Sequence, residues 1–389
     1  MINKVILLLF IITSTSLGQQ KFTELIDLLH SETDSVNKAA MISNYLSRNK
    51  IPVVEEMSIY FIYRGNAKIA AAPGELNGWN IDKSLMQKID GTNLFFRVDT
   101  LDAAGRAEYK IWVDSVWMLD PLNQRKALGG FGFNSDVWMP QYSLSTEIEF
   151  DDGIPHGKID TIWFASKILK RTHPVLIYQP FTKLMKNLAT IYVNDGGEYL
   201  SIGKMNNVLD NLIANNVTRP VIGVFIDPRT DPANPESNMR MVDYSASEDY
   251  LKFLTDELIP FVEKNYPVST EASDRLIIGA SMGGLISTFA SYSRPDVFKN
   301  SAAQSPAYMQ ANISVIEMIA EGGYKNINVY IDTGILYDTK IVSRIAKALL
   351  VERKIKLNYT EYPEGHNWTN WQARLDDILK YFFGKEIKK

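Results

Sequence analysis

The segment DRLIIGASMGGLISTFASYS, residues 274–293, decides the fold of this chain. An apolar run ends at Gly279, small residues follow, and apolar residues then recur at helical spacing. The segment therefore predicts a buried strand, a sharp turn and a helix. Gly279, Ser281 and Gly283 fit the pattern G-x-S-x-G, in which flanking glycines permit a strained backbone at the serine. Ser281 is thus a candidate nucleophile; the alternative is a turn that only packs a strand against a helix.

Apolar runs alternate with helical stretches on both sides of this segment. We expect further strands at ATIYVND (189–195), PVIGVFID (220–227), 326–333 and KLNYTEY (356–362), and helices near 205–214, 250–265, 339–353 and 368–383. Residues 158–170 and 173–180 are expected to open the region as an antiparallel pair. This alternation predicts an α/β class domain over residues 143–389, with a doubly wound, mostly parallel sheet covered on both faces.

The first part of the chain has different periodicities. Residues 22–47 show a helical pattern, which predicts a helical N-terminal segment over 19–52. Short alternating runs between Ser58 and Trp117 are separated by Gly, Asn and Asp, and predict a small β-sandwich over 53–142. Residues 120–142 are rich in Gly, Pro and Asn, and we expect them to form a long connection across both domains.

The N-terminus has the pattern of a secretory signal peptide over residues 1–18. Lys4 precedes an apolar run, residues 5–12, and small and polar residues follow up to Gly18. The run is too short to span a bilayer, although a retained anchor is the alternative. We therefore expect a periplasmic or secreted protein without stable membrane insertion after cleavage.

Composition excludes several classes of function. The net charge of −4 and the lack of a basic stripe argue against nucleic acid as a partner. The chain has no cysteine, which excludes disulfides, thiolate nucleophiles, zinc–thiolate sites and iron–sulfur clusters. We expect no metal site and no cofactor, and oligomeric state is not indicated by the sequence.

A serine nucleophile needs a base, and the chain contains four histidines. His30 lies in the N-terminal helical segment, His156 between the domains and His173 at the start of an early strand. In a nucleophile-elbow fold the order along the chain is serine, acid, histidine, with the histidine after the last strand. Only His366, in EYPEGHNW, satisfies this order.

The acid should follow the penultimate strand, NINVYIDTGILYD. Asp332 lies within that strand and Asp338 in the loop beyond it. A carboxylate in the loop can reach the His366 ring and fix its tautomer, which favours Asp338. For either residue the alternative is a helix cap.

Acyl transfer also needs backbone donors for an oxyanion. One is the N–H of Met282, directly after the serine. The second is expected from the loop after ATIYVND, where the N–H of Gly197 or Glu198 is the candidate. The alternative for this NDGG sequence is an ordinary turn.

These motifs together resemble the esterase group of the α/β-hydrolases, which includes enterochelin esterases, esterase D, and feruloyl and acetylxylan esterases. The resemblance runs from about residue 157 to 383 and rests on VNDGGEYL, IIGASMGG and EGHNWTNWQARL. The DGGEY loop is more similar to the enterochelin esterases than to the feruloyl esterases. The resemblance supports Asp338 as the acid, although ILYD spaces it slightly differently. Arg240 fits a recurring arginine of the group, but Asp243 stands where glutamate is expected.

Residues 58–117 resemble immunoglobulin-like early-set modules related to glycogen-binding domains, on PGELNGW and AEYKIWVDSVWMLDPLN. In enterochelin-esterase-like proteins such a module precedes the catalytic domain. Trp79, Trp112 and Trp117 are candidates for stacking on sugars, and the alternative is that they are core residues.

The resemblance implies a serine esterase that cleaves a small-molecule or oligosaccharide ester, with enterochelin-like siderophores as the leading substrate class. Tyr199, Arg240 and Trp368 are the expected substrate-binding residues. One alternative is a feruloyl or acetylxylan-type carbohydrate esterase. The other is a non-catalytic carbohydrate- or siderophore-binding protein on a hydrolase fold.

Overall fold

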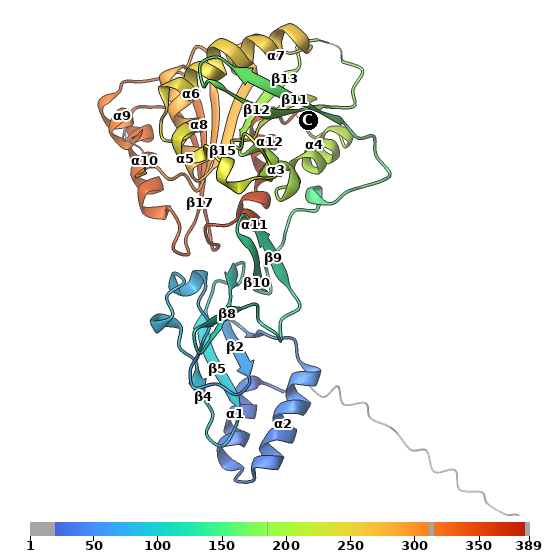
Figure 1. Ribbon diagram of the computed structural model, residues 1–389, viewed down its shortest axis with the longest axis vertical. Helices are drawn as coiled ribbons and strands as arrows, with labels where there is room; N and C mark the ends of the chain where they lie inside the picture. The colour runs from blue at the N-terminus through green and yellow to red at the C-terminus, as the bar shows by residue number, and fades with distance from the viewer. Residues whose placement is uncertain (1–19, 185, 311–314, 386–389) are drawn as a thin grey trace, which may run out of the picture.

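The computed structural model describes residues 20–184, 186–310 and 315–385, and the signal peptide expected over 1–18 lies outside them. Within these residues no helix is long and apolar enough to cross a membrane. An N-terminal part of two helices and small sheets lies below a larger α/β part in Figure 1. The parallel strands of the large sheet end at the edge that faces the N-terminal part.

The N-terminal part begins with two helices, α1 (Phe22–Ser31) and α2 (Ser35–Arg48). The Asp34 carboxylate caps α2 by accepting from two backbone N–H groups of its first turn. The apolar faces of both helices pack against the first strands, in a cluster that includes Phe22, Tyr45 and Ile62. The strands of this part are β1 (Val53–Glu55), β2 (Ser58–Arg64), β3 (Ala70–Ala71), β4 (Gln87–Lys88), β5 (Leu94–Thr100), β6 (Arg106–Tyr109), β7 (Ile111–Val113), β8 (Val116–Met118), β9 (Lys126–Gly129) and β10 (Gly132–Trp138).

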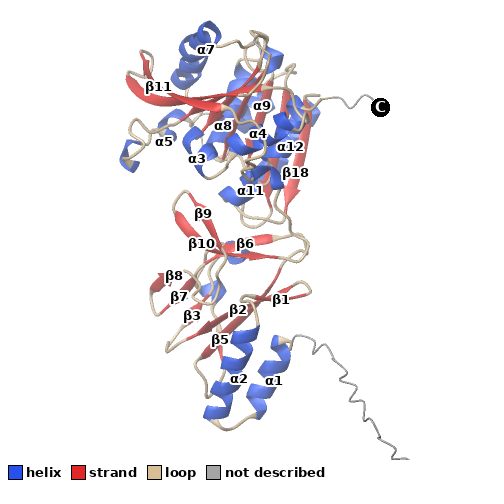
Figure 2. Ribbon diagram, turned by 90° about the vertical axis from the view of Figure 1, so that its right-hand side faces the viewer, coloured by secondary structure: helices blue, strands red, loops and turns tan. Residues whose placement is uncertain are grey.

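These strands form three antiparallel sheets, with the orders β1-β2-β5-β4, β6-β10-β9 and β3-β7-β8. The expectation of a connection over residues 120–142 is wrong, because β9 and β10 pair as a hairpin within it. Glycines at its tip obscure the strand alternation, and Gly132 adopts φ +100° there. β9 lies beneath helix α11 (Trp368–Gln372), which brings the hairpin to the larger part (Figure 2). Trp79 and Trp117 are at the surface, 36% and 46% exposed.

The larger part contains an eight-stranded sheet of order β11-β12-β14-β13-β15-β16-β17-β18. β12 is antiparallel to both of its neighbours, and the remaining pairs are parallel. The strands are β11 (Lys158–Ser166), β12 (Arg171–Gln179), β13 (Ala189–Asn194), β14 (Val221–Ile226), β15 (Arg275–Ala280), β16 (Asn300–Gln304), β17 (Asn328–Gly334) and β18 (Lys356–Tyr362). This order confirms the expected α/β-hydrolase fold. β16 was not predicted, because its residues NSAAQ have little apolar character although the strand lies inside the sheet.

Helices cover both faces of this sheet. They are α3 (Gly196–Ser201), α4 (Met205–Ala214), α5 (Arg240–Asp243), α6 (Glu248–Lys252), α7 (Ile259–Asn265), α8 (Met282–Ser293), α9 (Val315–Glu321), α10 (Lys340–Glu352), α11 and α12 (Leu375–Phe383). One core cluster joins the sheet to α6, α7, α8, α9 and α10, and the other joins it to α3, α4, α11 and α12. The closing helix expected over 368–383 is two helices, because the chain turns at Ala373 and Arg374.

Candidate active site

Ser281 lies on a sharp turn between β15 and α8. Its φ of 56° and ψ of −116° are strained for a residue with a side chain. The turn is fixed by the backbone: the Ser281 N–H donates to the Gln304 carbonyl at 2.8 Å, and the Ser281 carbonyl accepts from Ala307 N–H at 3.0 Å. A Cβ at Gly279 would lie 2.4 Å from the Gly283 backbone, so only glycine fits there. The sequence pattern thus produces the strained elbow that its chemistry requires.

Asp338 lies in the loop after β17, and His366 lies in the loop after β18. The distance from His366 Nδ1 to Asp338 Oδ1 is 2.6 Å. The Asp338 carboxylate is 0% exposed, whereas the His366 side chain is 36% exposed. Burial alone raises the pKa of Asp338, but the hydrogen bond and charge of His366, with other donors, outweigh it and hold that pKa below its usual value. The carboxylate is therefore charged and oriented toward the ring.

Asp332, the alternative acid, has a different environment. Its side chain is fully buried in β17; its Oδ2 accepts from Gln304 Nε2 at 3.3 Å, and its Oδ1 has no hydrogen-bond partner among the described residues. Burial raises the pKa of Asp332 to about 8. Asp332 therefore packs within the sheet and does not contact His366.

Ser305, which was not among the predicted site residues, connects Asp338 to Trp371. It follows β16 with a φ of 43°. Its hydroxyl donates to Asp338 Oδ2 at 2.6 Å and accepts from Trp371 Nε1 at 3.0 Å. The Trp371 ring meets the His366 ring edge to face, with centroids 5.0 Å apart. No sequence signal marks Ser305, because its role depends on strand order.

The residues of the site thus follow the carboxyl-terminal ends of four neighbouring parallel strands. β15, β16, β17 and β18 are adjacent, and they are followed by Ser281, Ser305, Asp338 and His366, respectively. Among the described residues, no hydrogen bond joins Ser281 to His366. Such contacts commonly tighten only when substrate binds.

The expected oxyanion donors lie in the first turns of α8 and α3. Met282 occupies the first position of α8, where an N–H has no partner within the helix. The Glu198 N–H donates to the Asp195 carbonyl at 3.0 Å, so that donor is already used. A Cβ at Gly197 would lie 2.3 Å from Asp227 Oδ2. Of the two early-loop candidates, Gly197 is therefore the one whose N–H is not used in a backbone hydrogen bond among the described residues, and a side chain there would displace the Asp227 and Arg229 side chains.

Arg240 joins the two backbone segments that carry these donors. Its Nε donates to both oxygens of Asp195, at 2.9 and 3.0 Å, and its Nη2 donates to the Ala280 carbonyl at 3.0 Å. We expected Arg240 to bind substrate; its Nε and Nη2 are committed to this pairing, its side chain is 24% exposed, and a contact with substrate stays a prediction. A second arginine, Arg229, lies next to Gly197 and pairs with Asp227 through Nη2 at 2.6 Å.

Tyr199 and Trp368, the other expected substrate-binding residues, lie in the core beneath the site. Tyr199 is 0% exposed and donates its hydroxyl hydrogen to Gln304 Oε1 at 2.9 Å. Trp368 is 5% exposed and packs edge to face against Tyr199, with centroids 5.2 Å apart. The expectation is wrong for both, because α3 and α11 turn these aromatic faces inward to cover the sheet.

No metal site accompanies this arrangement within the described part of the chain, where no three His, Asp or Glu side chains are placed to hold an ion.

The chain matches the family model described as "Putative esterase" over residues 166–382. It is 27% identical over 241 residues to the uncharacterized protein YjcH of Bacillus subtilis, covering 58% of this chain and 97% of that protein. It is 24% identical over 254 residues to the iron(III) enterobactin esterase of Escherichia coli, covering 59% of this chain and 62% of that protein.

The likeness to a solved structure extends further along the chain. The ferric enterobactin esterase of Salmonella typhimurium superposes with a TM-score of 0.74 at 17% identity, covering 87% of this chain and 98% of that one. At this identity the likeness shows the fold, including strands of the N-terminal part. Together with the family match over more than half of the chain, these findings show that the protein is a carboxylic ester hydrolase of the esterase family, with an α/β-hydrolase fold.

Proposed function

We propose that Ser281, His366 and Asp338 form the catalytic triad of this esterase and that its substrate is a siderophore ester of the enterochelin type. The observation that best supports the triad is the 2.6 Å contact between His366 Nδ1 and Asp338. It lies at the same end of the parallel strands as Ser281, whose backbone is strained. His366 Nε2 is then free to face the nucleophile.

In the proposed mechanism, His366 takes the hydroxyl proton of Ser281 as the oxygen attacks the ester carbonyl. The backbone N–H groups of Met282 and Gly197 hold the oxyanion, and Asp338 stabilises the imidazolium. His366 returns the proton to the leaving alcohol, and the acyl-serine forms. Water then attacks this acyl-enzyme with His366 again as the base. His366 then returns this proton to the Ser281 oxygen, which releases the carboxylic acid and restores the enzyme.

The substrate proposal rests on two resemblances. The E. coli and Salmonella relatives are named for enterobactin, and the likeness to the Salmonella protein covers 87% of this chain, which includes the N-terminal part. The DGGEY loop is also similar to that of the enterochelin esterases. We further propose export, because residues 1–18 have the pattern of a signal peptide. N-terminal sequencing of the mature protein tests this, and an intact Met1 would contradict it.

The triad is tested by steady-state hydrolysis of p-nitrophenyl butyrate. Ser281→Ala should lower kcat by at least about 10³-fold. A variant as active as the wild type would exclude the serine mechanism, and a wild type inactive on every ester would favour a binding protein.

The substrate class is tested by comparing kcat/KM for a cyclic triscatecholate ester, methyl ferulate and acetylated xylan. The proposal predicts the highest value for the triscatecholate. A higher value for methyl ferulate or acetylated xylan would reassign the enzyme to the carbohydrate esterases.

A further inference from the structure

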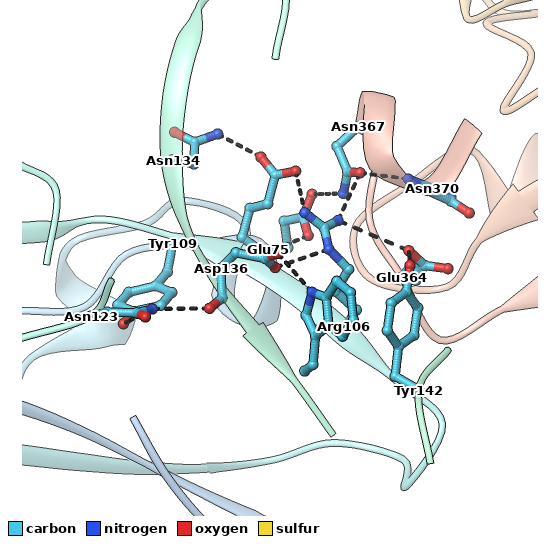
Figure 3. Close-up of polar contacts among 12 residues, drawn as sticks. Glu75, Arg106, Tyr109, Asn123, Asn134, Asp136, Tyr142, Glu364, Asn367 and Asn370 are labelled. Carbon is cyan, nitrogen blue, oxygen red and sulfur yellow. Dashed lines mark hydrogen bonds and ion pairs between the residues drawn. The ribbon is translucent and has the colours of Figure 1, made fainter. Parts of the chain in front are cut away.

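A cluster of buried charged side chains joins the N-terminal part to the loop that carries His366 (Figure 3). At its centre is Arg106 on β6, whose guanidinium is 0% exposed. Its Nη2 lies 2.8 Å from Glu108, and its Nε lies 2.9 Å from Asp136. These two carboxylates belong to the N-terminal part itself, and they hold the guanidinium in one orientation.

The remaining contacts of Arg106 cross to the larger part. We call residues 363–367 the base loop, since they include His366. The Arg106 backbone N–H donates to the Pro363 carbonyl at 3.1 Å, and its Nη1 donates to Asn367 Oδ1 at 3.0 Å. Nη1 also lies 3.9 Å from the buried Glu364 carboxylate. One arginine of the N-terminal part thus contacts both ends of the base loop.

Glu75 makes a second link from the N-terminal part. Its Oε1 accepts from Asn367 Nδ2 at 2.6 Å, and its Oε2 accepts from the Glu108 N–H at 2.9 Å. A Cβ at Gly365 would lie 2.2 Å from the Glu75 carboxyl carbon, so Glu75 packs against the backbone directly before His366. Both neighbours of the base are therefore held from the N-terminal part.

The larger part contributes its own supports to the base loop. Asn367 Oδ1 accepts from the Asn370 N–H at 2.8 Å and caps α11, while Asn370 Nδ2 donates to the Gly365 carbonyl at 3.0 Å. Glu364 is 0% exposed and pairs with Arg374. Tyr142, at the end of the N-terminal part, also donates its hydroxyl hydrogen to Glu364, at 3.1 Å. The side chains of Glu364 and Asn367, on either side of His366, are thus held by fixed partners.

A buried ionic cluster of this kind adds little net stability over apolar packing, because removal of the charges from water offsets their attraction. What it provides is a single geometry. The group whose geometry matters most here is the imidazole of His366, since displacement of a catalytic group by about 1 Å can cost about 10²-fold in rate.

We propose that Arg106 and Glu75 are positioning residues for the catalytic base: through Asn367 and the base loop backbone, the N-terminal part sets the place of His366 relative to Ser281 and Asp338. The inference rests on the proposed triad. It makes the N-terminal part a component of the active site and assigns a catalytic role to a module that the resemblance links to glycogen-binding domains.

The contact between Glu75 and Asn367 allows a reciprocal exchange as the test. Asn367→Asp keeps an oxygen for Arg106 and a cap for α11, but it removes the N–H donor to Glu75 and adds a second carboxyl group to this buried contact. The double variant Glu75→Gln/Asn367→Asp restores the hydrogen bond in the opposite direction. We expect Asn367→Asp to lower kcat by about 10- to 10²-fold with little change in KM, and the double variant to return kcat to within about threefold of the wild type.

A second readout follows the base itself. Covalent labelling of Ser281 by a fluorophosphonate requires activation by His366 but no acyl pocket, so its rate should fall in parallel with kcat. Asn134→Ala is the matched control, because Asn134 contacts Glu108 at 2.7 Å on the side of the cluster away from the base loop. Its kcat should stay within about twofold of the wild type.

Three outcomes would each overturn the inference. They are a wild-type kcat in Asn367→Asp, a double variant with a kcat no higher than that of Asn367→Asp, and a labelling rate that stays at the wild-type value while kcat falls. If Asn367→Asp does not fold by circular dichroism, Arg106→Lys replaces it, since Lys keeps the buried charge but loses the fork that reaches Asn367. Unchanged kcat in that variant would equally overturn it. A wild-type protein that neither hydrolyses esters nor reacts with the fluorophosphonate would instead contradict the proposed triad.

Discussion

Asp338→Asn is the substitution whose effect follows most directly from the structure. The buried carboxylate contacts four donors at 2.6 Å each: His366 Nδ1 and the Thr339 N–H at Oδ1, and the Ser305 hydroxyl and the Gly334 N–H at Oδ2. An amide NH₂ group cannot accept a hydrogen bond. In either orientation of the amide, a buried backbone N–H therefore loses its acceptor, and the charge that stabilises the imidazolium is lost.

The expected loss in kcat approaches 10⁴-fold, because an amide facing His366 Nδ1 forces that nitrogen to accept and places the ring proton on Nε2, toward Ser281. This loss corresponds to about 5 kcal/mol of activation free energy. The orphaned backbone N–H adds a destabilisation of about 1–3 kcal/mol to the folded state. Both quantities are measured on one preparation, by p-nitrophenyl butyrate kinetics and by denaturant unfolding.

The stability effect of Asp338→Asn should depend on pH. Burial raises the pKa of Asp338, but the hydrogen bond and charge of His366 together with the other donors outweigh it and hold the pKa below its unfolded value. The charged carboxylate therefore stabilises the folded state above the unfolded pKa, and this contribution is lost as the pH falls through the folded pKa. The difference in unfolding free energy between wild type and variant should be largest near neutral pH and should shrink under acid.

Asp332→Asn is the matched control, since Asp332 lies in β17, directly before the loop that contains Asp338. Because burial raises the pKa of Asp332 to about 8, its carboxyl is mostly protonated near neutral pH, and an amide is a close replacement. Its kcat should stay within about threefold of the wild type. If Asp332→Asn impaired turnover more than Asp338→Asn did, the assignment of Asp338 as the acid would be refuted.

Three further outcomes follow from the site. Gly197→Ala should lower kcat by up to about 10²-fold, since its methyl group would overlap the Asp227 carboxylate and the Arg229 guanidinium beside the second oxyanion donor, while Gly323→Ala, with nothing within 4 Å, should leave kcat unchanged. Arg240→Lys should lower kcat by about 10-fold or more through loss of the paired contacts to both donor segments, and the exposed Arg294→Lys serves as its control in the same kinetic assay. Because burial raises the folded pKa of Asp332 to about 8, its contribution to wild-type stability should be lost as the pH rises from about 4 to about 8. Thermal melts at several pH values should therefore show a weaker fall in Tm for Asp332→Asn than for the wild type. Parallel curves of Tm against pH for the two proteins would contradict this prediction.

The nucleophile elbow and the mostly parallel character of the sheet could be predicted because they depend on local patterns. Strand, turn and helix around Ser281 follow from periodicity and two glycines, and His366 was singled out by its place after the last strand. The contact between His366 and Asp338 spans only 28 residues across adjacent strand ends. Such neighbours can be inferred once a parallel sheet is recognised.

Other features depend on contacts that no local pattern encodes. Arg106 and Asn367 are 261 residues apart, and Glu75 and Asn367 are 292 apart, so their meeting follows only from how the two parts of the chain dock. Tyr199 and Trp368 were misjudged because proximity to a motif does not tell which face of a short helix is buried. The β9–β10 hairpin was missed because glycines at its tip hide its alternation.

The central claim is that Ser281 is the nucleophile, and active-site labelling tests it most directly. The protein is incubated with a fluorophosphonate, and the modified peptide is identified by mass spectrometry. The account predicts one adduct per chain, on Ser281, with loss of ester hydrolysis in proportion to labelling. Full inactivation with the adduct on another residue, or persistent hydrolysis after complete labelling of Ser281, would contradict it.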